Sequence, residues 1–163
     1  MGTAKNVFIS HHHKDDKSVT DFTNLLAGKD YNIKNSSIRV KDKNKDRLEK
    51  NQIPRKTLER LLSMKMRWAG TVVVLVGSQT HSREWVNWEI EEAERLGKRI
   101  LGVFMQGAKE SDIPESLEKY GDGLVGWNSE KIIAGLEGED VGWCSSTGET
   151  RNPTNNLRRV SCQ

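Results

Sequence analysis

Long hydrophobic runs are absent from this chain of 163 residues. The longest uninterrupted apolar run is Val72–Val76, whereas about 20 such residues are needed to cross a bilayer. The N-terminus has no basic stretch followed by an apolar one, which an export signal would need. We therefore expect a cytoplasmic protein without a membrane-spanning segment.

Cysteine is almost absent as well. The two cysteines, Cys144 and Cys162, both lie in the polar C-terminal part of the chain. A disulfide between them is chemically possible, but it would cross-link no part of a hydrophobic core. We interpret them as free thiols in a reducing compartment.

The chain has little excess of either charge. Charged residues make up 30% of it, but the net charge is only +3. This composition is typical of one soluble domain with a single core. Residues 39–50 are basic only locally, with six basic and three acidic side chains. They are either a solvated loop or a rim that attracts an anionic, phosphate-bearing ligand. Few aromatic residues interleave with these charges, so nucleic acid is not the favoured partner.

Several familiar nucleotide and catalytic motifs are missing. No GxxxxGK[ST] loop and no GxGxxG fingerprint follows the first predicted strand, so ATP hydrolysis and Rossmann-type dinucleotide binding are unsupported. A phosphoacceptor aspartate would end the third predicted strand, but Gly77 and Ser78 stand there. The nucleophile elbow GxSxG is absent too. These absences leave the loops at the strand ends as the places to search for a site.

Apolar periodicity predicts an alternation of strands and helices. The predicted strands cover residues 5–10, 38–40, 71–77, 99–104 and 123–127, and the predicted helices cover 15–27, 54–68, 83–96, 113–119 and 129–135. The alternation favours a parallel sheet covered by helices on both faces. We place the domain at residues 1–137. Residues 138–163 form a polar tail that either drapes over the domain or stays loose.

The helix predicted over residues 83–96 carries the most informative residues. Val86, Ile90 and Ala93 define its buried stripe, and Glu89 lies about 60° from the centre of that stripe. We therefore expect Glu89 at the border, partly shielded and partly reachable, with Trp85 one turn before it. Ser82 is a candidate N-cap and Gly97 a stop signal. A helix start behind a strand is where open α/β sheets bind ligands, so this acid is either catalytic or a packing detail.

Histidines crowd the loop after the first predicted strand. Three consecutive side chains, His11 to His13, do not converge on one ion without a special turn, so we predict no metal site. We expect one histidine to face the cleft as a hydrogen-bond donor while another packs or caps. Asp15 and Asp16 suit the N-terminus of the following helix. Ser78, Thr80 and His81 precede the key helix, where capping roles compete with ligand contact.

Three segments in this order resemble a TIR-like domain. They are FISHHHKDD after the first strand, TVVVLVG as the third strand, and THSREWVNWEIEEA at the start of the key helix. Within that family the chain resembles the small TIR-like signalling subunit of Thoeris-type bacterial antiphage systems. The resemblance covers residues 5–135, and its most specific element is W-x-x-x-E, from Trp85 to Glu89. It implies an α/β, flavodoxin-like three-layer sandwich with a five-stranded parallel sheet.

The resemblance also implies an activity, the cleavage of the nicotinamide–ribose bond of NAD⁺, which is a substrate and not a cofactor. Glu89 would be catalytic, and Trp85 would be a stacking wall for nicotinamide. The ADP-ribose-derived product, often cyclic, would activate a separate effector protein. The further candidate ligand contacts are Ser10, His11, His12, Lys14, Ser78, His81 and Trp88.

Two other functions remain open at this stage. Many TIR domains only assemble with other TIR domains, so a non-catalytic interaction module is the main alternative. Some TIR enzymes complete their site by self-association. A nucleoside-processing transferase of the same fold would also use a glutamate on ribose.

Overall fold

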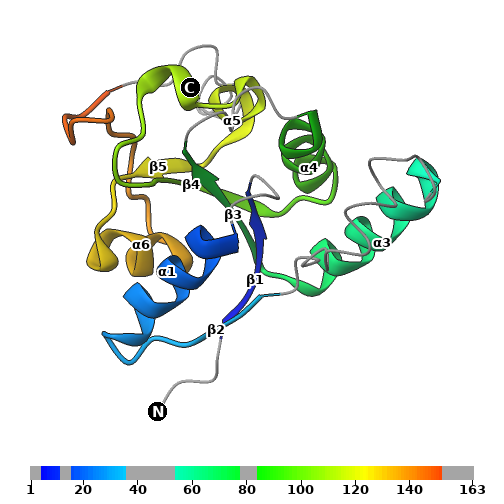
Figure 1. Cartoon of the computed structure of the whole chain (residues 1–163), viewed down its shortest axis with the longest axis horizontal. Helices are drawn as coiled ribbons and strands as arrows, with labels where there is room; N and C mark the ends of the chain where they lie inside the picture. Colours follow the sequence, from blue (N-terminus) through cyan, green and yellow to red (C-terminus); the bar gives the residue numbers. More distant parts are fainter. Residues whose placement is uncertain (1–4, 12–15, 36–53, 78–83, 152–163) are drawn as a thin grey trace.

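Five parallel strands form the centre of the molecule. The structure, a computed structural model, describes residues 5–11, 16–35, 54–77 and 84–151. The strands are β1 (Lys5–Ser10), β2 (Ile33–Asn35), β3 (Thr71–Val76), β4 (Arg99–Phe104) and β5 (Gly123–Val125). Their order is β2-β1-β3-β4-β5, and every neighbouring pair is parallel (Figure 1). This is the strand order of flavodoxin-like folds.

Helices cover both faces of the sheet. One face carries α1 (Asp16–Ala27) and α6 (Ser129–Leu136), and the other carries α3 (Arg55–Trp68), α4 (Glu84–Arg95) and α5 (Glu115–Tyr120) (Figure 1). A short 3₁₀ helix, Glu110–Asp112, precedes α5. Among the described residues, no helix has both the length and the apolarity to span a membrane. The predicted three-layer α/β architecture is confirmed.

The strands alternate strictly between two hydrophobic cores, as the pleat requires. In β3, which is buried throughout, Val72 and Val74 pack on the side of α3, α4 and α5, while Val73 packs on the side of α1 and α6. In β1, Phe8 belongs to the first of these cores. Ser10 is two residues further on, so it faces the same side, towards α4.

The second strand lies elsewhere than predicted. The structure places β2 at Ile33–Asn35, paired with the start of β1, whereas the predicted strand over residues 38–40 falls outside the described residues. The three residues of β2 are half-buried or exposed, because the strand lies at the sheet edge. Its weak apolar pattern explains why the sequence did not reveal it.

Helix α3 buries a different stripe from the predicted one. Leu58 and Leu62 are buried as expected, and Met66 continues their row at intervals of four residues. The sequence predicts one apolar stripe of Leu58, Leu61, Leu62 and Trp68 on this helix, and this is wrong for Leu61 and Trp68, which are 40% and 48% exposed. Ser63, next to Leu62, is the fourth buried residue of the helix.

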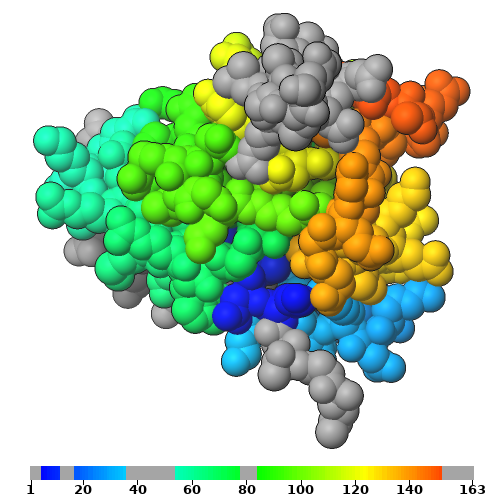
Figure 2. Space-filling model, turned by 180° about the vertical axis from the view of Figure 1, so that it is seen from behind, coloured from blue at the N-terminus to red at the C-terminus, as the bar shows by residue number. Residues whose placement is uncertain are grey.

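The segment after Gly138 packs onto the domain as far as the structure describes it. Trp143 is 3% exposed, and it forms a parallel bridge with Leu124 of β5. Figure 2 shows this segment, in orange, lying along the yellow part of the chain. The guanidinium of Arg151 donates to Glu118 at 2.8 Å and lies over the Trp143 ring. Residues up to 151 thus drape over the sheet edge.

Of the two cysteines, the structure describes only Cys144. Cys144 is a buried free thiol, and burial raises the pKa of that thiol. Cys162 lies outside the described residues, as do the basic run 39–50 and the candidate cap Ser82.

At the C-terminal end of the key helix, Gly97 has a φ of 70° and Lys98 donates its N–H to the Ala93 carbonyl, so the predicted glycine stop is confirmed.

Candidate functional site

The site lies at the topological switch point of the sheet, between β1 and β3. Strands β1 and β3 are neighbours, yet the chain leads from β1 outwards to β2 and from β3 the opposite way to β4. At such a switch point the loops behind the strand ends diverge and leave a crevice for a ligand. Ser10 ends β1, and α4 begins a few residues after the end of β3. The first turns of α4 therefore stand beside the end of β1.

Ser10 and Glu89 join these two elements. The hydroxyl of Ser10 donates a hydrogen bond to Oε1 of Glu89 at 2.8 Å, and both side chains are buried. The residues are 79 positions apart in the sequence. The sequence analysis named both residues as site candidates, with Ser10 as a ligand contact. It did not predict the contact between them.

Glu89 lies deeper than its position on the helix suggested. Its side chain is 8% exposed, so the predicted border position is wrong. The apolar stripe reports only the side of α4 that faces the sheet, whereas α4 also packs against α3 and α5. This burial raises the pKa of the Glu89 carboxyl from 4.5 to about 8, and the hydrogen bond from Ser10 opposes part of the rise. A carboxyl so perturbed at a switch point is typical of a functional site.

Two tryptophans flank the first turns of α4. The rings of Trp85 and Trp88 meet edge to face, 5.6 Å apart at an interplanar angle of 76°. Both rings are half-buried and pack on the core beneath α4. Trp85, four residues before Glu89, shares its side of the helix.

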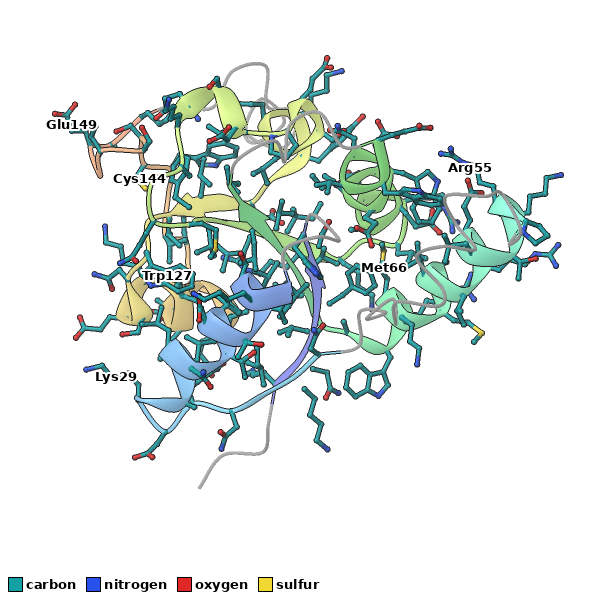
Figure 3. The ribbon with its side chains drawn as sticks, in the orientation of Figure 1. Lys29, Arg55, Met66, Trp127, Cys144 and Glu149 are labelled. Atoms are coloured by element: carbon teal, nitrogen blue, oxygen red, sulfur yellow. The ribbon has the colours of Figure 1, made fainter. Side chains whose placement is uncertain are left out.

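Arg55 covers the ring of Trp85. Its guanidinium carbon lies 4.7 Å from the ring centroid. It also donates to Glu84 at 2.7 Å and to Glu59 at 3.0 Å. Figure 3 shows Arg55 at the end of α3 that lies beside α4. The sequence analysis did not name Arg55. The spacing of Arg55 and Glu59 predicts an ion pair on one helix. The position of Arg55 over Trp85 depends on how α3 and α4 pack.

A surface groove of about 340 Å³ lies beside Trp88. It is polar, and several of its charged side chains are paired with each other. Neither Glu89 nor Ser10 belongs to its lining. We place the candidate site at Glu89, because the perturbed carboxyl and the switch point coincide there. The groove is lined by Arg55, Glu84, Asn87, Trp88, Glu91, Glu115, Ser116 and Lys119.

The remaining predicted site residues are only partly described. His11 is half-buried, and its Nδ1 lies 3.3 Å from the carbonyl oxygen of Ile9, so the ring folds back on its own strand. Within the described ranges, no three His, Cys, Asp or Glu side chains gather as metal ligands would. The other candidates fall outside the described residues: His12, His13, Lys14, Asp15, Ser78, Thr80 and His81.

Comparison with known proteins gives a family match over most of the domain. The family model described as "Thoeris protein ThsB, TIR-like domain" matches residues 8–110. A protein of Bacillus cereus (strain MSX-D12), named "Putative cyclic ADP-D-ribose synthase ThsB1", is 30% identical over 123 residues. That alignment covers 73% of this chain and 57% of the relative, so the chain spans little more than half of the relative's length.

A solved structure also shows a distant likeness. The TIR domains of the activated Roq1 resistosome, which recognises the pathogen effector XopQ, share 18% identity with this chain at a TM-score of 0.40. The match covers 62% of this chain and 57% of the other. A likeness of this degree supports no argument about activity.

Proposed function

The chain belongs to the ThsB family of Thoeris TIR-like domains, and from this premise we propose that it cleaves NAD⁺ at the nicotinamide–ribose bond. Glu89 would be the catalytic residue. The product would be an ADP-ribose derivative, cyclic in form, that activates a separate effector protein. Support comes from the family, from the name of the relative, and from a buried glutamate at the switch point of the sheet.

One carboxylate is sufficient for this chemistry. Glycosidases use a second acid to protonate a poor leaving group. Nicotinamide in NAD⁺ departs as a neutral molecule from a cationic pyridinium, so its departure needs no proton. An oxocarbenium-like ribose centre remains, and the ionised Glu89 stabilises it electrostatically or by accepting hydrogen bonds from ribose hydroxyls.

The burial of Glu89 has two opposite consequences for this role. A low local dielectric strengthens the attraction between a carboxylate and a cationic ribose centre. The same burial holds the pKa of Glu89 at about 8, so most of the ligand-free protein carries the neutral acid near neutral pH. The positive pyridinium of an arriving NAD⁺ favours the ionised form and lowers that pKa. Substrate binding would thus help to generate the catalytic carboxylate.

The ring of Trp85 is the surface on which nicotinamide would stack. In the structure its face carries the guanidinium of Arg55, a planar cation. A pyridinium is also a planar cation, and both groups are attracted by the negative face of an indole. Arg55 would leave that face when NAD⁺ enters. Cyclisation would then follow if a nucleophile of the same ligand is folded close to the ribose carbon, because proximity lets it compete with water.

The buried contact between Ser10 and Glu89 carries the proposal, and Glu89→Gln tests it. Glutamine keeps the shape of the side chain and its ability to accept from Ser10, but it cannot ionise. Glu91→Gln is the matched control, since Glu91 is exposed on the same helix. Release of nicotinamide from NAD⁺ should occur with the unchanged protein and the control and be lost in Glu89→Gln, with the product identified by mass. Equal release by all three proteins would exclude Glu89 as the catalytic group.

A further inference from the structure

The hydroxyl of Ser10 is fully enclosed by protein. Ser10 is 0% exposed, and its oxygen lies 2.8 Å from Oε1 of Glu89. A side chain enclosed in this way touches a ligand only after the neighbouring side chains move. The sequence predicts Ser10 as a ligand contact, whereas the contact that the structure shows for its hydroxyl is with Glu89.

We propose that Ser10 is a positioning residue, which holds Oε1 of Glu89 so that the second carboxylate oxygen, Oε2, faces the ribose of the substrate. The proposal rests on the catalytic role proposed for Glu89. Among the described residues, Ser10 is the one hydrogen-bond partner that the structure gives this carboxylate. One oxygen is therefore fixed by protein while the other is left for the substrate.

Ser10 is held rigidly enough for this purpose. Strand β1 pairs with β2 on one side and with β3 on the other, and Ser10 itself stands opposite Val74. The alternation that buries Phe8 under the helices also directs Ser10 towards α4. A site supported by a central strand keeps its geometry better than one supported by a loop.

The same hydrogen bond favours the ionised carboxylate. Burial raises the pKa of Glu89, and donation from Ser10 is the one effect that opposes the rise. Charged groups on the packed helices do not contribute: Arg55 of α3 pairs with Glu59 and Glu84, and Glu92 of α4 pairs with Arg95. Loss of the Ser10 hydroxyl should therefore reduce the ionised fraction of Glu89 and loosen its orientation together.

The experiment compares three variants of the full chain. Ser10→Ala removes the donor, and Ser10→Thr keeps a hydroxyl with a β-branched side chain that suits a strand. Ser116→Ala is the control, because Ser116 is also buried and donates to a glutamate of α4, Glu91, at 3.3 Å. Nicotinamide release is measured against NAD⁺ concentration and pH, and unfolding in urea is measured over the same pH range.

We expect Ser10→Ala to lower kcat by about 10- to 100-fold, the effect of one hydrogen bond to a charged group, with little change in KM. The midpoint of its pH–rate profile should move to higher pH, Ser10→Thr should recover most of the rate, and Ser116→Ala should match the unchanged protein. Unchanged kcat and midpoint in a folded Ser10→Ala protein would overturn the proposal. So would a lowered kcat without a shifted midpoint, because a general structural defect gives that result.

Failure of the proposed function would look different. If the unchanged protein releases no nicotinamide, the isolated chain does not cleave NAD⁺. The contact is then tested by the pH dependence of stability, to which the ionisation of Glu89 contributes. An upward shift of that dependence in Ser10→Ala supports the hold of Ser10 on Glu89, and an unchanged dependence overturns it.

Discussion

Replacement of Glu89 by glutamine should make the protein more stable while it removes the proposed activity. Glu89 is buried, and its carboxyl has a pKa of about 8 in the folded protein against 4.5 in the unfolded chain. Between these two pH values the folded state holds a proton that the unfolded chain has released. The free energy of unfolding therefore falls as pH rises through this window. Glutamine has no proton to lose and escapes this penalty.

The size of the effect follows from the two pKa values. With about 1.4 kcal/mol for each pKa unit, the penalty is close to 1 kcal/mol near pH 5 and about 3 kcal/mol near pH 7. It reaches about 4 kcal/mol near pH 8. For a chain of this length, about 3 kcal/mol corresponds to a rise in Tm of roughly 6–12 °C.

The assay is urea unfolding of Glu89→Gln, Glu91→Gln and the unchanged protein at several pH values from about pH 4 to pH 8. The gain from Glu89→Gln should be near zero at the acidic end and should grow steadily with pH. Glu91→Gln is the control, because Glu91 is exposed on the same helix. A gain that does not vary with pH, or a variant less stable than the unchanged protein near pH 8, would refute the assignment of a neutral, buried Glu89.

Four further outcomes follow from the same geometry. The kcat/KM for NAD⁺ should rise with pH up to about 8, since the ionised Glu89 is required, and a flat profile would contradict this. Arg55→Gln should lower KM for NAD⁺ several-fold by uncovering Trp85; a higher KM would instead indicate that Arg55 binds the substrate. Trp85→Ala should raise KM more than Trp85→Phe does, and equal effects in steady-state kinetics would exclude stacking. Trp143→Ala should cost about 3–5 kcal/mol in urea unfolding, whereas a loss below about 1 kcal/mol would show that the packed tail is dispensable.

The order of strands and helices could be read from the sequence because it depends on local patterns. Residues 71–76 are apolar on both faces, as a central parallel strand must be, and Val86, Ile90 and Ala93 repeat at helical spacing. The glycine stop at Gly97 is equally local. Edge strand β2 escaped prediction because a strand with half-buried sides carries little apolar signal.

The sequence by itself determined which residues are available at the switch point, namely an acid four positions after a tryptophan on a helix that follows the third strand. Only the tertiary structure decided their environment. In the packed molecule Glu89 is buried with a pKa near 8, β1 brings the Ser10 hydroxyl to its carboxylate, and α3 brings Arg55 over Trp85. Periodicity along one helix reports the side that faces the sheet. It does not report which neighbours close on the other sides, because those contacts join residues tens of positions apart.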